Sequence, residues 1–245
     1  MNKIVVATLL VTGLSSSSFA ATTSPSSSTL TSALEVLKLP SENRRMVVQG
    51  QGDKYYASFV QMAFDEAQAM NVRWRSLMAA AEARGEKSTP DLLKAGEHKH
   101  WFMRNAALVA LAEVNPAQSE KLAKKLLKDK ALVVRSAAVA TLEKSASAEV
   151  REQLWEELNQ KYNFKNKQSL WIRHQIVEVL AKKPLDRETQ SFAGLLSDKD
   201  ERIHLHAVHG LERLTGVKLG GANPIKKSAL VGMWKDYVKN EKVGL

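Results

Sequence analysis

The amino-acid sequence predicts an all-α fold, an α-solenoid of about five helical hairpins with a helical cap at its N-terminal end. Two observations carry this prediction. Five segments repeat one helical pattern, mostly at intervals of 31 residues, and no segment shows the strand alternation or tight turn that indicates a sheet. One hairpin of this length cannot bury its apolar face alone, so stacking of hairpins is the physical solution.

The chain begins with the pattern of a secretory signal peptide. A lysine precedes an apolar run over residues 4–14, and small residues, Ser18 and Ala20, stand at the positions that signal peptidase inspects. The run is well short of the roughly 20 residues that a membrane-spanning helix needs. We therefore expect residues 1–20 to be cleaved and the protein to be exported, either periplasmic or secreted. No later segment is apolar enough to span a membrane.

Three further regions follow the signal. Ser and Thr dominate residues 21–30, which cannot bury a core and are expected to be a flexible tether. Residues 31–54 are predicted to form the N-terminal helical cap, whose first helix ends before Pro40 because the residue before a proline is biased away from helix. Residues 55–245 are then the repeat array, with a capping helix at the C-terminal end.

The five repeated segments align on one position, which we call the anchor. The anchors are Arg73, Arg104, Arg135, Arg173 and His204, at intervals of 31, 31, 38 and 31 residues. Apolar residues recur at offsets −1, +3, +4, +7 and +10, the period of a helix with one buried arc. The longer interval is expected to hold a polar loop near YNFKNKQ. Capping residues such as Asn115 and Ser147 start second helices between the repeated ones, so the unit is a hairpin.

The segment DKALVVRSAAVATLEK (129–144) resembles HEAT repeats, including the short HEAT-like repeats of the phycobilisome-lyase type. It matches them in its Asp, Val-Arg, paired alanines and Leu, in the family's order. The resemblance extends with varying quality over residues 55–214, and it is specific for fold rather than for function. It implies that Asp129 and Arg135 belong to a ladder of aspartates and arginines that fixes the stack of repeats.

The other anchor arginines are candidates for the same ladder. Arg73, Arg104 and Arg173 lie within the apolar arc, where a buried charge must be paired. However, no acidic residue precedes Arg104 or Arg173 at the spacing of Asp129 and Arg135, and a histidine replaces the fifth arginine. The sequence therefore predicts a ladder that is broken at several rungs.

The resemblance also implies that the repeated helices line the concave side of the stack. Offsets +1, +5 and +9 point away from the buried arc and predict the binding surface. Its candidate residues are Trp74, Met78, Asn105, Lys144, His174, Glu178, Lys182, His209 and Arg213. Trp74 and Met78 are expected to anchor a partner, with Lys182 and Arg213 contributing charge. The alternative for Trp74 is that it packs under the N-terminal helices.

Three of the six histidines lie in RIHLHAVHGLERL (202–214), which raises the question of a metal site. The repeat pattern accounts for their positions without a metal, so we expect no metal and no cofactor. One combination does place zinc-ligand residue types on the same outward surface, namely His174 and Glu178 of the fourth repeat with His209 of the fifth.

Composition and motifs favour a binding protein over an enzyme. The chain has no cysteine, hence no disulfide and no thiol nucleophile, and it lacks the common catalytic and phosphate-binding motifs. Its formal net charge of +10 favours acidic partners. We expect a non-enzymatic scaffold of the cell envelope whose concave face binds a protein or peptide. Two alternatives remain. One is a module that binds an acidic polymer or, although export argues against it, nucleic acid, and the other is a lyase-type enzyme, which fold analogy suggests. The sequence does not indicate the oligomeric state.

Overall fold

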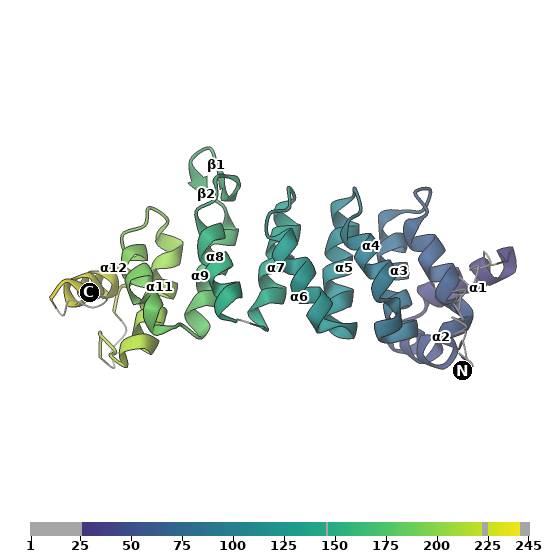
Figure 1. Cartoon of the computed structure of the whole chain (residues 1–245), viewed down its shortest axis with the longest axis horizontal. Coiled ribbons are helices and arrows are strands. Elements are labelled where there is room, and N and C mark those ends of the chain that lie inside the picture. Colours follow the sequence, from purple (N-terminus) through teal and green to yellow (C-terminus); the bar gives the residue numbers. More distant parts are fainter. Residues whose placement is uncertain (1–25, 146, 222–224, 241–245) are drawn as a thin grey trace, which may run out of the picture.

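Helical hairpins stack side by side into one elongated array in the computed structural model (Figure 1). The structure describes residues 26–145, 147–221 and 225–240. The predicted signal peptide at 1–20 and the first half of the predicted tether lie outside these residues. Within them, no helix combines the length and the apolar character that crossing a membrane requires.

The helices and strands have the following bounds. The α-helices are α1 (Ser27–Lys38), α2 (Ser41–Phe64), α3 (Met70–Arg84), α4 (Thr89–Gly96), α5 (Trp101–Val114), α6 (Pro116–Leu126), α7 (Leu132–Glu143), α8 (Ala148–Leu158), α9 (Trp171–Lys182), α10 (Thr189–Leu195), α11 (His204–Thr215) and α12 (Lys227–Asn240). Short 3-10 helices are η1 (Gly85–Ser88), η2 (Lys161–Asn163), η3 (Asp186–Glu188) and η4 (Glu201–Ile203), and the strands are β1 (Phe164–Lys165) and β2 (Gln168–Ser169).

The N-terminal cap differs from its prediction at both boundaries. Helix α1 begins within the predicted tether, because the Ser26 side chain caps it by accepting a hydrogen bond from the Thr29 amide. The predicted boundary at residue 54 falls inside α2, which bends at Gln51 and continues from the cap into the first hairpin. At Gly52 a Cβ atom would lie 2.5 Å from the carbonyl oxygen of Ala83, so only glycine permits this close approach of α2 to α3.

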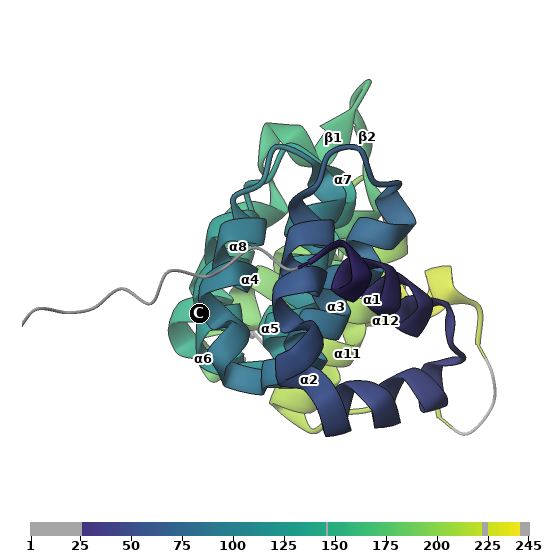
Figure 2. The ribbon, with the colours of Figure 1, turned by 90° about the vertical axis from the view of Figure 1, so that its right-hand side faces the viewer.

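Five hairpins follow one another along the described part of the chain. They pair α2 with α3, α4 with α5, α6 with α7, α8 with α9 and α10 with α11, and α12 packs on α11 at the end. The second helix of each hairpin carries an anchor. These anchor helices pack against one another along the array more closely than the helices of the other row do. Figure 2 looks along the array and shows α4, α6 and α8 on one side with α3 and α11 on the other. The closer row is the one expected on the concave side.

The predicted buried arc forms the core. At offset +4 every anchor helix carries a fully buried aliphatic side chain, and offset +7 is buried in the same way. One continuous core runs from α2 to α12, where Trp234 closes it, and a smaller cluster joins α1 and α2 to α3. The all-α solenoid predicted from the sequence is therefore the fold of this chain.

The long interval between the third and fourth anchors holds a small β-hairpin instead of a plain loop. Strands β1 and β2 are antiparallel, with Phe164 opposite Ser169. The turn between them consists of Asn166 and Lys167, both with positive φ, as a tight two-residue hairpin turn requires. The sequence analysis missed it because Asn-Lys is a weaker turn signal than Asn-Gly and neither strand is apolar. The hairpin projects from one edge of the array (Figure 1).

Candidate binding surface and the ladder beneath it

The anchor arginines form a buried ladder that links successive repeats. Arg104 donates from Nε and Nη2 to the two carboxylate oxygens of Asp129, at 2.6 and 2.7 Å. The backbone carbonyl of Asp129 accepts from Nη1 of Arg135 at 2.8 Å. Asp129 thus holds two anchors at once, the preceding one through its side chain and its own through its backbone. Asp129 and Arg135, which the resemblance assigned to the ladder, therefore both belong to it, and the carboxylate of Asp129 pairs with Arg104 of the preceding repeat.

Asp198 repeats this arrangement and was missed by the sequence analysis. Its carboxylate lies 2.7 Å from Nη2 of Arg173, and its carbonyl lies 2.8 Å from Nε2 of His204. Asp198 precedes His204 by six residues, as Asp129 precedes Arg135. The spacing of six residues was therefore visible in the sequence, but acidic residues were expected only before an arginine, and residue 204 is a histidine. The acid in fact serves the arginine of the preceding repeat.

Two neutral residues complete the ladder. His98 takes the position of the aspartate for Arg73, with 3.2 Å between Nη2 and Nε2. Asn163 lies in the long interval between the third and fourth anchors, and its side-chain oxygen accepts a hydrogen bond from Nε of Arg135 at 3.1 Å. The expectation of a broken ladder was wrong for the described residues, because uncharged hydrogen-bonding side chains replace the missing carboxylates.

Burial and hydrogen bonding act in opposite directions on the charges of the ladder. Burial disfavours the carboxylate of Asp129, but hydrogen bonds from Arg104 and from the Ala131 amide outweigh it and hold the pKa of Asp129 below its usual value. The pKa of Asp198 is lowered in the same way, against its burial, by Arg173 and the Asp200 amide. These carboxylates are therefore charged at neutral pH.

A third ion pair, which the sequence did not reveal, is fully buried and links the other row of helices. Arg151 of α8 donates from Nε to Glu188 of η3 at 2.8 Å, and both side chains are buried. Glu188 also accepts from the indole nitrogen of Trp155 at 3.1 Å. No repeat column contains these residues, so their pairing could not be inferred from the periodicity.

The predicted surface residues divide into exposed and half-buried ones. We call the solvent-facing side of the anchor helices α3, α5, α7, α9 and α11 the anchor-helix face. Of its predicted residues, Lys144, Lys182, His209 and Arg213 are exposed, whereas Trp74, Met78, Asn105, His174 and Glu178 are half-buried.

The half-buried residues at the N-terminal end are engaged within the protein. Trp74 and Met78 pack against the main core, and Asn105 donates to the Val133 carbonyl at 3.3 Å. Trp74 and Asn105 stand at offset +1, which was expected to point outward. In the structure this position lies at the edge of the buried arc and contacts other parts of the stack. Trp74 and Met78 are therefore poor candidates for free anchors of a partner.

Exposed apolar side chains lie instead on three successive anchor helices, α5, α7 and α9. Val109 of α5, Val133 of α7 and Trp171 of α9 are exposed to 41, 41 and 46%. Val109 stands at offset +5 from its anchor, whereas Val133 and Trp171 stand at offset −2. Because these offsets differ by seven residues, which is nearly two helical turns, all three side chains lie on the same outward arc. The sequence analysis overlooked offset −2. We call these three residues the apolar strip.

A basic depression lies on the same face between α7 and α9. It has a volume of about 380 Å³ and is lined by Ala140, Glu143, Lys144, Val179, Lys182 and Lys183. Lys182 bridges the two helices through an ion pair of 2.5 Å with Glu143. Among the described residues, Lys144 and Lys183 have no ion-pair partner, so they can receive an acidic group.

A larger depression of about 540 Å³ lies beside the β-hairpin, and four of its charged side chains form two ion pairs. Asp200 pairs with Arg202 at 2.8 Å, and Asp198 pairs with Arg173. Lys167 and Lys199 also line this depression, so it too has a basic character.

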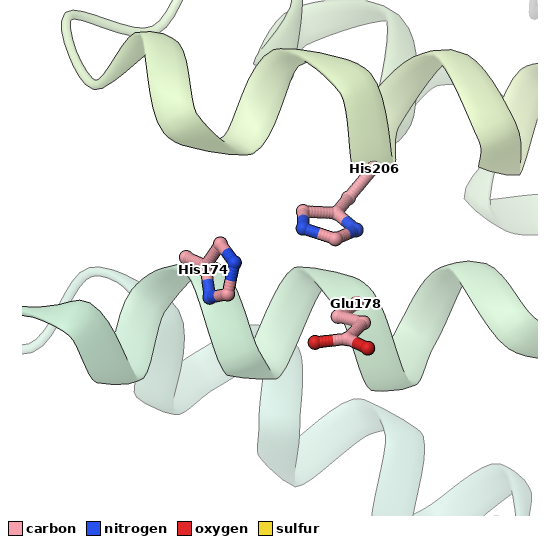
Figure 3. A group of neighbouring side chains, drawn as sticks. All are labelled: His174, Glu178 and His206. Carbon is pink, nitrogen blue, oxygen red and sulfur yellow. The ribbon is translucent and has the colours of Figure 1, made fainter.

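Three side chains with metal-ligand chemistry meet between α9 and α11 (Figure 3). They are His174, Glu178 and His206, whose candidate ligand atoms all lie within 4.8 Å of one another. Burial, followed by the nearby His174, lowers the pKa of His206. The sequence analysis combined His174 and Glu178 with His209, but His209 is exposed and lies outside this group. His206 was missed because offset +2 was assigned to no surface.

Comparisons with known proteins support the fold. Residues 56–143 match the family model of HEAT repeats. Among solved structures, the chain is similar to the X-ray structure of YibA from Escherichia coli, with 16% identity and a TM-score of 0.54, over 87% of this chain and 82% of that one. At this identity the likeness concerns the fold alone. A search of the curated proteins found no match. Residues 56–143 therefore match HEAT repeats, and the described chain as a whole is an α-solenoid of stacked helical hairpins.

Proposed function

We propose that this protein is a non-enzymatic binding protein whose anchor-helix face holds a protein or peptide partner. HEAT repeats generally serve as scaffolds for protein interactions, and stacked repeats provide an extended surface for this purpose. The observation that carries the proposal is the apolar strip. Single exposed apolar residues are ordinary, but Val109, Val133 and Trp171 share one outward arc on three successive anchor helices whose core-facing positions are already filled.

The charges on the anchor-helix face indicate the chemistry of the partner. Lys144, Lys182 and Lys183 line the depression at the C-terminal ends of α7 and α9, the ends opposite to Val133 and Trp171, and the chain as a whole has a formal net charge of +10. Such a surface attracts acidic partners and accelerates their association. The partner is therefore a protein segment with apolar side chains for the strip and acidic residues for the lysines.

We further propose that the protein acts outside the cytoplasm, in the cell envelope or beyond it. The support is the signal-peptide pattern of residues 1–20. Fractionation of the cells, followed by N-terminal sequencing of the protein, tests this proposal. A mature chain that begins at Ala21 in the envelope or the medium is expected, and an intact Met1 in the cytosol would contradict it.

The binding proposal is tested by capturing the partner and then weakening its contact with the strip. A photo-crosslinking residue introduced at Val133 identifies what lies against the anchor-helix face in cells. The affinity of that partner is then measured for Trp171→Ala and for Trp74→Ala, which remove the same side chain from an exposed and a core-packed position.

The two tryptophan variants are expected to differ clearly. Trp171→Ala should reduce the affinity by about tenfold or more, as truncation of an interface aromatic does. Trp74→Ala should leave the affinity of the folded protein nearly unchanged. Loss of affinity only in Trp74→Ala would show that the partner binds at the N-terminal end, where the sequence analysis expected it.

A module for acidic polymers is the second candidate, and the basic depression is the observation that favours it. Affinity for a polyanion falls steeply with salt and depends on the lysines. The variant with Lys144, Lys182 and Lys183 all changed to Ala would then lose binding, whereas Trp171→Ala would not. For a protein partner the order of the two effects is reversed, because rim charges mainly tune association rates.

A further inference from the structure

Two neighbouring anchor helices bring a set of metal ligands together. His174 and Glu178 stand four residues apart on α9 and therefore share one face of that helix. His206 projects toward them from α11 of the next repeat (Figure 3). The two imidazole rings lie 4.7 Å apart in an edge-to-face arrangement.

The donor set and its spacing suit zinc. Imidazole nitrogen and carboxylate oxygen are both zinc ligands, and two ligands four residues apart on one helix are a recurring way to hold this ion. Tetrahedral ligands at about 2.1 Å from zinc lie about 3.4 Å from one another. The candidate atoms here lie within 4.8 Å of one another, so a shift of little more than 1 Å between them gives the tetrahedral spacing.

Within the described part of the chain, none of these three side chains makes a short polar contact outside the group. None of them donates or accepts a side-chain hydrogen bond there. The nearest cation to Glu178 is Lys182, at 4.0 Å, but Lys182 makes its short ion pair, 2.5 Å long, with Glu143. All three side chains are half-buried, so the candidate ligands are partly shielded from water.

We propose that His174, Glu178 and His206 bind one divalent transition-metal ion, Zn²⁺ by preference, which bridges the fourth and fifth repeats. Three protein ligands leave one tetrahedral position open to water or to a further donor. Because its ligands come from two helices, the ion strengthens the contact between α9 and α11. This inference is independent of the function proposed above, and it replaces the expectation of no metal that the repeat pattern suggested.

The test uses the untagged chain from Ala21 onward, stripped with a chelator and dialysed, since a histidine tag would itself bind zinc. Calorimetric titration with ZnCl₂ should show saturable binding of one ion per chain. Zinc at about a hundredfold excess over the dissociation constant should raise the melting temperature by roughly 5 °C or more. The absence of saturable binding would overturn the proposal.

Three variants locate the site. His206→Ala and His174→Ala should each weaken zinc binding by more than about tenfold. Loss of a residue that only hydrogen-bonds a ligand already costs about tenfold or more, and loss of the ligand itself costs more. His209→Ala is the matched control, on the same helix as His206 but outside the group, and should change the affinity by less than about threefold. Circular dichroism confirms that each variant is folded. Zinc binding that survives in folded His206→Ala, or is lost in His209→Ala alone, would overturn the assignment.

Discussion

The junction between α5 and α7 and the junction between α9 and α11 have the same buried contacts but different surfaces. Each is held by one aspartate that pairs with the preceding anchor arginine, Asp129 with Arg104 and Asp198 with Arg173, at nearly equal distances. On the outward side the first junction presents Val109 and Val133, whereas the second presents Trp171 together with two histidines and a glutamate.

This difference shows which positions of a repeat are free to carry function. The buried side must satisfy the same packing and the same charge in every repeat, so its residues recur. The outward side contributes little to stacking, so it varies from one junction to the next. Function is therefore expected where the repeats differ from one another, and stability where they agree.

The largest effect is expected from a charge placed in the shared buried arc. Leu142→Asp puts a carboxylate at a fully buried position of α7 and should lower the free energy of unfolding by about 4 kcal/mol or more. Ala140→Asp, on the exposed side of the same helix, should change it by less than about 0.5 kcal/mol. Urea denaturation measures both, and equal losses would show that the two faces are wrongly assigned.

Removing the aspartate from each junction is expected to have the next largest effect. Asp129→Ala leaves Arg104 buried and unpaired, which should cost about 3–5 kcal/mol of the free energy of unfolding. Asp198→Ala should cost less, about 2 kcal/mol, because the Asp198 side chain is 19% exposed, against 5% for Asp129, and water can partly replace it. Chemical denaturation of the two variants gives the order, and a larger loss for Asp198→Ala would contradict it.

The sequence was sufficient to predict the architecture, because periodicity depends only on which residues are apolar. The helical hairpins, their buried arc and the membership of the arginines in that arc all follow from the spacing of the anchors. The hydrogen-bond partners of the arginines cannot be derived from the spacing of the anchors. Asp198 repeats the spacing of Asp129, but the use of each acid by the preceding repeat is a property of the stack.

The candidate sites depend on side chains that reach across from another helix. The metal-ligand group needs His206, whose approach to His174 is set by the crossing of α9 and α11 and not by any one helix. Helical periodicity likewise could not show that Trp74 is covered, since its neighbours belong to other elements. Periodicity assigns faces correctly, but the packing of neighbouring helices decides which residues of a face stay accessible.

The pH dependence of stability sharpens the role of the ladder carboxylates. The pKa of Asp129 is lower in the folded chain than in the unfolded chain, where it is about 3.9. Its charged form therefore contributes stability above that value, and the contribution is lost as the pH falls through the folded pKa. The difference in unfolding free energy between the natural chain and Asp129→Asn should narrow between about pH 7 and about pH 3. A difference that stays constant over this range would contradict the ion pair with Arg104.

The smallest effect on stability is expected for the apolar strip, and two adjacent valines of α7 provide the comparison. Val133 is 41% exposed and Val134 is fully buried, although they occupy consecutive positions of one helix. Val133→Ser should change the free energy of unfolding by less than about 0.5 kcal/mol, whereas Val134→Ser should cost about 2 kcal/mol through lost apolar burial and an added hydroxyl. Thermal melting of the two variants in parallel measures the contrast. A small loss for Val133→Ser combined with weaker partner binding would show that its apolar side chain serves recognition, because the fold does not need it. A loss for Val133→Ser as large as that for Val134→Ser would instead assign Val133 to the packing of the array and remove it from the apolar strip.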